Sequence, residues 1–275
     1  MYADVRPSVI AGTWYPGNRD QLQKTIGGYF KKVKDRPVQG EIVGLISPHA
    51  GYTYSGQVAA YGYKRVVGKS FDIVVVVSPL HQMAVGRYVV NSAFHYETPL
   101  GRVPVSKELV QKVAGEVDIT FVSQDNEHSL EIQLPFLQFA LGDFSLLPLM
   151  IGHGNVYDCD DLVKAIVKIL KGKKSLLVAS TDLHHIADYD EVVREDKAVV
   201  EALSGFDLEN IRETLNRRDC SVCGRVPVLV VAEATQKMGA KKLLVLHQTN
   251  SGDVTGEKGF GQYTVGYLSA AIIKS

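Results

Sequence analysis

The chain of 275 residues lacks the features that would point to several common classes of protein. Its 30 basic and 30 acidic side chains leave no net charge, which argues against a protein that binds nucleic acid through a basic surface. Its apolar runs, such as 73–77, fall far short of the ~20 residues that a membrane span needs. The first residues include Asp4 and Arg6 and show no apolar segment typical of a secretory signal.

Cysteine is also scarce, because the chain has only Cys159, Cys220 and Cys223. Three cysteines are too few for a disulfide scaffold, so we expect the reducing cytoplasm as the compartment. The sequence has no glycine-rich phosphate loop and no G-x-S-x-G motif. The sequence therefore contains no motif that indicates a nucleotide cofactor or a serine hydrolase.

What the sequence does contain is an alternation of apolar runs and amphipathic stretches from end to end. No linker, repeat or low-complexity block interrupts it, so we expect one α/β domain over residues 1–275. The apolar runs are continuous and rich in Val, Ile and Leu, which is typical of strands covered by helices on both faces. The expected strands are 41–47, 71–78, 145–151, 175–180, 242–249 and 263–273, with short edge strands at 88–91 and 119–122.

Helices are predicted where apolar residues recur at helical spacing behind a capping residue. They are a helix capped by Asn18, one from Ser55 to Gly68, one capped by Ser106, 158–170, 189–203, and one with Pro227 in its first turn that stops at Gly239.

Histidines and an aspartate follow four of the expected strands at the points where these strands end. The carboxyl ends of parallel strands share one edge of a sheet, and ligands bind outside that edge. His49 alone is equally well explained as a residue of a turn, but four strand ends together favour one polar site. The residues concerned are His49, His81, His153, Asp182, His184 and His185.

Cys220 and Cys223 form a C-x-x-C pair, whose meaning the spacing leaves open. The pair is compatible with a redox dithiol, with half of a zinc site, or with thiols that merely pack in the core, as Cys159 also could. Cys223 lies just before the helix that contains Pro227. There the helix dipole would lower the pKa of its thiol and make it a better nucleophile and metal ligand. The sequence does not settle whether Cys220 and Cys223 form a disulfide.

A second polar cluster occupies residues 125–131. His128 and Glu131 are three residues apart, so on a helix they would share one face. The spacing is not that of the H-E-x-x-H metalloprotease motif. Two interpretations remain open: these side chains line the pocket, or they belong to a solvated helix start with acidic residues near its N-terminus.

Taken together, five blocks of the sequence resemble the Memo family, whose prokaryotic members are also called AmmeMemoRadiSam system protein B. The blocks occur in the family's order over nearly the whole chain: 11–16, 47–56, 127–131, 180–185 and 223–225. The family in turn resembles the class III extradiol dioxygenases, which contain non-haem iron. The resemblance implies a three-layer αβα sandwich around a mostly parallel or mixed central sheet, with a pocket at one edge of the sheet.

The resemblance also implies a divalent metal ion held by His49, His81 and Cys223. Extradiol enzymes hold Fe(II) with two histidines and a carboxylate, whereas here a thiolate takes the place of the carboxylate. A soft sulfur ligand shifts the preference toward Cu(I) or Zn. We therefore expect Fe(II) first, with copper or zinc as alternatives, and a purified sample that can lack the metal.

In this interpretation His185 is the general acid or base, oriented by Asp182, with a pKa near neutrality. The expected pocket-lining side chains are Trp14, Tyr15, Tyr54, His128 and Glu131.

The function expected from this site is that of a metal-dependent oxidoreductase acting on a small or peptide-derived substrate. One alternative is a binding module that uses the same pocket for a peptide or an acidic ligand without turnover. Another is a zinc-dependent hydrolase. The resemblance further suggests a pathway shared with AMMECR-type and radical-SAM proteins. From the balanced charge and the short apolar runs we expect no nucleic-acid or membrane partner. The sequence does not reveal the oligomeric state.

Overall fold

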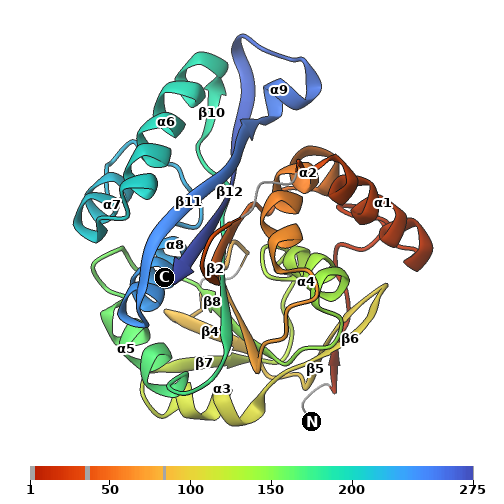
Figure 1. Cartoon of the computed structure of the whole chain (residues 1–275), viewed down its shortest axis with the longest axis vertical. Helices are drawn as coiled ribbons and strands as arrows, with labels where there is room; N and C mark the ends of the chain where they lie inside the picture. Colours follow the sequence, from red (N-terminus) through yellow and green to blue (C-terminus); the bar gives the residue numbers. More distant parts are fainter. Residues whose placement is uncertain (1–3, 35–37, 83–84, 275) are drawn as a thin grey trace.

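The computed structural model describes residues 4–34, 38–82 and 85–274 of the chain. Its largest feature is a mixed β-sheet that, within these residues, contains nine strands in the order β10-β12-β2-β9-β3-β8-β4-β7, with β11 paired to β12 (Figure 1). The strands are β2 (Glu41–Ser47), β3 (Ile73–Pro79), β4 (Tyr88–Asn91), β7 (Ile119–Val122), β8 (Leu146–Ile151), β9 (Ser175–Ser180), β10 (His185–Asp188), β11 (Ala240–Asn250) and β12 (Phe260–Lys274).

The four central strands, β2, β9, β3 and β8, run parallel, so their carboxyl ends meet at one edge. Strand β12 is antiparallel to β2, and β4 is antiparallel to β8, which makes the sheet mixed. The sequence predicted β2, β4, β7 and β9 with these bounds, and the other runs with ends that differ by a few residues.

Helices cover both faces of the sheet, as neighbouring residues of β2 show. Gly44 lies against Thr235 of helix α8, whereas the next residue, Leu45, lies against Gly62 of helix α2. One layer contains α1 (Arg19–Lys32), α2 (Tyr52–Tyr63) and α4 (Leu134–Leu141). The opposite layer contains α3 (Lys107–Ala114), α5 (Asp160–Ile169), α6 (Tyr189–Gly205), α7 (Leu208–Leu215) and α8 (Arg225–Lys237) (Figure 1). The expected α/β sandwich is therefore confirmed.

Short elements are where the sequence-based expectation fails. Strands β1 (Val5–Arg6), β5 (His95–Thr98) and β6 (Gly101–Pro104) form a small separate sheet that was not predicted, and neither was β10. Such strands have too few residues to show a periodic pattern. The helical turns η1 (Lys64–Val66), η2 (Glu131–Gln133) and α9 (Ser251–Thr255) complete the fold.

The start of α2 also differs from the prediction, which placed Ser55 at the N-cap. The helix begins at Tyr52, with Gly51 before it. The Ser55 hydroxyl instead donates a hydrogen bond to the carbonyl of Ala50. The earlier start places the first residue of the helix only three residues after His49, close to the carboxyl end of β2.

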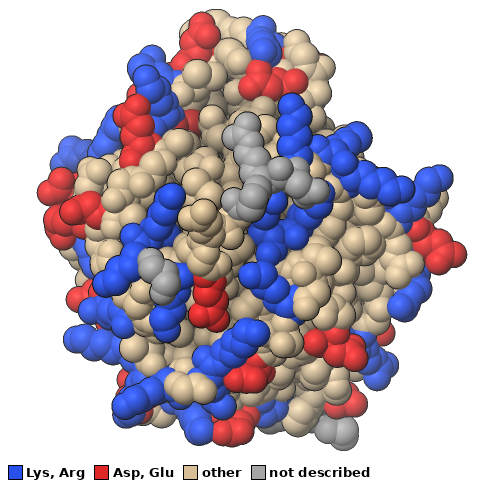
Figure 2. Space-filling model, viewed as in Figure 1, with Lys and Arg blue, Asp and Glu red and all other residues tan. Residues whose placement is uncertain are grey.

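On the face shown in Figure 2, basic and acidic side chains both reach the surface. In the described parts of the chain, no helix combines the length and the apolar character that crossing a bilayer would require.

Candidate metal centre

His49 follows β2 and is held from several sides in a buried position. Its backbone N–H donates to Oδ1 of Asp182 at 2.8 Å, and its ring nitrogen Nδ1 lies 3.1 Å from the Ser180 hydroxyl. That hydroxyl donates its only proton to the carbonyl of Ser129 and also accepts from the amide of Gln133. The hydroxyl can therefore only accept from His49, which fixes the ring proton on Nδ1 and leaves Nε2 with a free lone pair.

His81 follows β3, and Glu127 fixes its ring in the same tautomer. Nδ1 of His81 lies 3.0 Å from Oε1 of Glu127, and the His81 backbone N–H donates to the same carboxylate. Burial alone would raise the pKa of Glu127, but the hydrogen bonds and charge of His81 lower it to about 2. Because an ionised carboxylate only accepts hydrogen bonds, Nδ1 of His81 carries a proton, and Nε2 is the ring nitrogen left to face an ion.

Cys223 completes the group from the segment just before α8. Its sulfur lies 3.0 Å from Nε2 of His49 and accepts a hydrogen bond from the backbone N–H of Asp182 at 3.2 Å. The sequence led us to expect a lowered thiol pKa at this helix start. Instead, burial and then the charge of Asp182 raise the pKa of Cys223. The helix begins at Arg225, two residues later, so its dipole does not compensate for the loss of water.

His49, His81 and Cys223 each place one possible ligand atom in the same spot, and no two of these three atoms are more than 4.8 Å apart. Two imidazole lone pairs and a sulfur form a donor set that suits zinc, copper or iron. A second group of this kind, His81, Glu127 and His128, is less suitable. Oε1 of Glu127 already accepts hydrogen bonds from three N–H groups, which leaves it little capacity for an ion.

A cavity of about 530 Å³ opens beside this group. Trp14 and Tyr54, which the sequence assigned to a pocket wall, line it together with His128. The ring of Trp14 packs on His128 at 4.3 Å between centroids, and His128 stacks on His81 at 4.8 Å. The cavity also has lining residues that the sequence did not assign to a pocket, namely Thr13, Ala50, Gly51, Thr53, Tyr263 and Val265.

His185 and Asp182 also line the cavity, but the structure does not pair them as expected. In the described part of the chain, no hydrogen bond joins them. Asp182 accepts from the His49 backbone, and burial raises its pKa to about 7. Nδ1 of His185 lies 3.3 Å from the hydroxyl of Tyr263, and its Nε2 is buried without a partner among the described residues. Burial, then His81 and His184, lower the pKa of His185 to about 4 rather than leaving it near neutrality.

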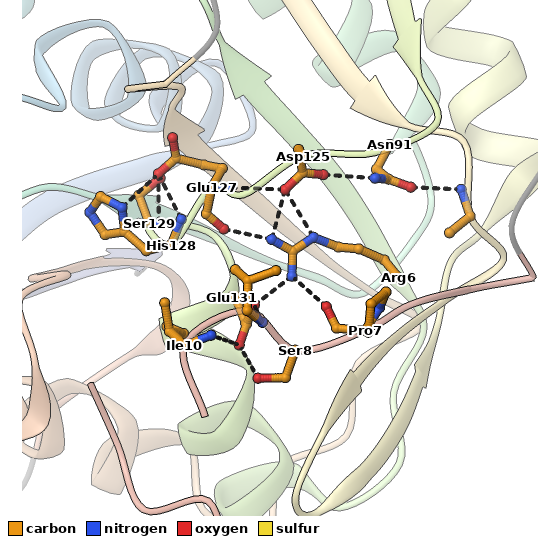
Figure 3. Close-up of polar contacts among 12 residues, drawn as sticks. Arg6, Pro7, Ser8, Ile10, Asn91, Asp125, Glu127, His128, Ser129 and Glu131 are labelled. Carbon is orange, nitrogen blue, oxygen red and sulfur yellow. Dashed lines mark hydrogen bonds and ion pairs between the residues drawn. The ribbon is translucent and has the colours of Figure 1, made fainter. Parts of the chain in front are cut away.

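Tyr15 and Glu131 lie outside the cavity lining. Glu131 belongs to a buried network around Arg6 (Figure 3). Glu131 is fully buried, so it is not part of a solvated helix start. It pairs with Arg6 and accepts hydrogen bonds from Ser8 and from Tyr15, the latter at 2.6 Å. Arg6 also pairs with Asp125 and donates to the carbonyl of Glu127 at 2.7 Å. The network therefore links the N-terminal segment to the loop whose Glu127 carboxylate holds His81.

Three other residues that the sequence singled out lie elsewhere. His153 is exposed and does not line the cavity, although it follows β8 at the same edge of the sheet. Cys159 and Cys220 are buried, and all three cysteines are free thiols in this structure. The structure thus brings together three of the four strand ends that were expected to share a site.

The protein is an α/β sandwich in which two histidines and a cysteine meet beside the carboxyl ends of parallel strands. This arrangement is that of a candidate metalloprotein. The sequence comparison then gives the family. The Memo model, described as Memo-like protein, matches residues 6–271, and the chain therefore belongs to the Memo family.

Relatives described as members of the same family match over almost their full length. A "MEMO1 family protein" of Thermotoga neapolitana is 36% identical and covers 98% of this chain and 99% of the relative. A protein of Pyrobaculum aerophilum with the same family description is 33% identical, with 96% and 98% covered. The crystal structure of an uncharacterised protein from Escherichia coli K12 is similar at a TM-score of 0.52 and 14% identity. The match covers 84% of this chain and 100% of that one, and it supports the fold alone.

Proposed function

We propose that this protein is a metal-dependent oxidoreductase that binds iron or copper through His49, His81 and Cys223. The observation that carries the proposal is the fixed tautomer of both histidines. Ser180 and Glu127 each hold a proton on Nδ1 of one ring, so in each ring Nε2 is the nitrogen left to bind a cation. Two imidazole nitrogens directed toward one sulfur favour metal binding, and a bound cation would itself displace the proton of the thiol. A reducing cytoplasm would keep the thiol of Cys223 available as a ligand.

The adjoining cavity would hold a small or peptide-derived substrate. Trp14, Tyr54 and Tyr263 offer aromatic walls against which an apolar body can pack. Burial, His81 and His184 lower the pKa of His185 to about 4, so the ring is neutral at pH 7 and, with its proton on Nδ1, would accept a hydrogen bond at Nε2. This nitrogen has no partner among the described residues, which leaves it available to a substrate hydroxyl. When bound, iron or copper would supply Lewis-acid and one-electron chemistry beside that substrate.

Purification without oxygen, followed by metal analysis, tests the first half of the proposal. We expect about one iron or copper ion per chain. His49→Ala removes a ligand and should lower the affinity for the metal by more than about 100-fold, because loss of a residue that only supports a ligand costs about 10–100-fold. His153→Ala removes an exposed histidine outside the cavity and is the matched control. Unchanged metal stoichiometry in His49→Ala would contradict the proposal.

Oxygen uptake over a panel of hydroxylated and peptide substrates tests the second half. We expect uptake by the iron or copper form and its loss in His185→Gln, which keeps metal binding. A zinc form with amidase or esterase activity would point instead to a hydrolase. A metal-free protein that binds peptides or acidic ligands without oxygen uptake would point to a binding module.

A further inference from the structure

A second cavity, of about 310 Å³, lies at the opposite end of α2 from the candidate metal centre. Tyr54, near the start of this helix, lines the cavity beside the metal centre, whereas Tyr61, near its end, lines the second one. The helix has 12 residues and is therefore about 18 Å long. The two cavities have no described residue in common, so the second, which we call the α2-end cavity, is a separate site.

Two cationic side chains, Lys34 and Arg65, line the α2-end cavity, and none of its described lining residues is acidic. Nη2 of Arg65 donates to the backbone carbonyl of Lys34 at 3.0 Å, which holds the guanidinium beside the residue that supplies the second cation. Among the described residues, neither side chain has an ion-pair partner. Both positive charges are therefore left for a ligand to neutralise.

Arg65 also leaves a buried donor unpaired. Its Nε is buried and has no hydrogen-bond partner in the described parts of the chain, where no other lysine or arginine nitrogen is in this state. Arg65 lies in the short helix η1, whose dipole favours a cation near its end. The dipole explains the charge but not a buried N–H group without an acceptor. Because such a group is costly to leave unpaired, we expect a ligand atom to accept from it.

The other walls of the cavity offer aromatic and apolar surface. The imidazole of His247 stacks on the ring of Tyr61 with 4.3 Å between the centroids. Burial lowers the pKa of His247, so the ring is neutral at pH 7 and has one N–H group to donate. Val38, Leu244 and Leu246 supply apolar contacts. A ligand with an anionic head and an apolar body would find partners for both parts.

We propose that the α2-end cavity binds a small phosphate monoester with an apolar body. Such a group carries close to two negative charges at pH 7, which matches Lys34 and Arg65, whereas a carboxylate would neutralise only one of them. Its three terminal oxygens can accept hydrogen bonds from the guanidinium, the ammonium and the imidazole. The volume of about 310 Å³ is at the lower end of the range for small-molecule sites, which selects a short organic chain.

An NMR titration of the wild-type chain with monobutyl phosphate at pH 7 tests the proposal without any variant. The protein is first freed of metal with a chelator, so that phosphate has no metal ion to bind. We expect saturable shifts of the His247 imidazole signals and none at His153, which is exposed and lines no described cavity. Absence of a saturable shift at His247 would overturn the proposal and would assign the acceptor at Nε of Arg65 to water.

Two comparison ligands test the chemical class by calorimetry. Butyl sulfate has the same tetrahedral head and chain but only one negative charge, and we expect a dissociation constant about tenfold higher, since one charge-assisted contact is weakened. Inorganic phosphate lacks the chain and should also bind about tenfold more weakly. Equal binding of butyl sulfate would contradict the match of charges, and equal binding of inorganic phosphate would contradict the role of the apolar walls.

A variant identifies the donor that the ligand needs. Arg65→Gln should weaken binding of butyl phosphate by about tenfold or more, because it removes the charged donor. Arg218→Gln removes an exposed arginine that lines no described cavity, and it is the matched control. Circular dichroism verifies that both variants are folded. A folded Arg65→Gln protein with the affinity of the wild type would contradict the proposal.

Discussion

Oε1 of Glu127 lies 3.0 Å from Nδ1 of His81, and this single contact decides which of the two ring nitrogens is available to an ion. The carboxylate also accepts the backbone N–H groups of His81, His128 and Ser129. Such a partner fixes the tautomer and orientation of a metal-binding histidine and raises its basicity. Glu127 is therefore a positioning residue for the candidate centre, although it does not line the cavity.

Replacing Glu127 by glutamine tests this relationship. Glutamine keeps the size of the side chain but removes the charge that holds the proton on Nδ1, so we expect metal affinity to fall about 10–100-fold. Competition with a chromogenic chelator measures the affinity. Glu201→Gln, at an exposed pair on α6, is the matched control and should bind metal like the wild type. Equal affinities for both variants would show that the contact is incidental.

Arg6 should be among the most costly charged residues to replace. It is 3% exposed and faces the buried carboxylates of Asp125 and Glu131, so Arg6→Met leaves two buried negative charges without compensation. We expect the free energy of unfolding to fall by about 3–5 kcal/mol, measured by urea denaturation. Arg102→Met, at an exposed pair with Glu97, should cost less than about 1 kcal/mol. Similar losses in the two variants would argue against a structural role for the network.

Two glycine substitutions should change stability in opposite directions. Gly266→Ala introduces a Cβ that overlaps the Asp196 carboxylate, and we expect a loss of about 1–3 kcal/mol or more. Gly28→Ala lies within α1, where a Cβ would meet nothing within 4 Å, and should stabilise the protein by about 0.5–1 kcal/mol. Thermal denaturation of both variants measures the difference. A harmless Gly266→Ala would mean that Asp196 is free to move.

The raised pKa of His184 predicts how stability depends on pH. The pKa rises from 6.5 to about 9 on folding, so the folded state holds this proton more tightly than the unfolded chain does. The contribution is complete below about pH 6.5 and is lost as pH rises through about 9. Urea denaturation across this range should show a fall in stability that His184→Gln removes, with His153→Gln as the exposed control. A fall of equal size in His184→Gln would assign it to other groups.

The fold was largely predictable because its central strands are continuous apolar runs. Residues 42–47 and 175–180 are buried on both faces, and continuous apolar runs of this length are typical of strands between two helix layers. The small sheet of β1, β5 and β6 was missed for two reasons. Strand β1 pairs with β5 across about 90 residues, which local sequence does not reveal, and β5 and β6 have only four residues each, too few to show an alternating pattern.

The candidate site was predictable where side chains follow strand ends, as His49 and His81 do. The spacing 125–131 drew attention to His128 and Glu131, yet the residue that holds His81 is Glu127, between two polar neighbours that gave no reason to prefer it. The choice of Cys223 over Cys220 came from family resemblance, because only the fold shows which sulfur reaches His49. The shifted pKa values of Cys223 and His185 also follow from burial, which a sequence does not state.

X-ray absorption spectroscopy of the metal-loaded protein tests the central claim most directly. We predict one sulfur neighbour and two imidazole neighbours around the ion, with a metal–sulfur distance of about 2.3 Å if zinc is used as the probe. In Cys223→Ser the sulfur signal should disappear while the imidazole signals remain. A spectrum of the wild-type protein with only nitrogen and oxygen neighbours would contradict the account, because the three side chains would then not hold one ion.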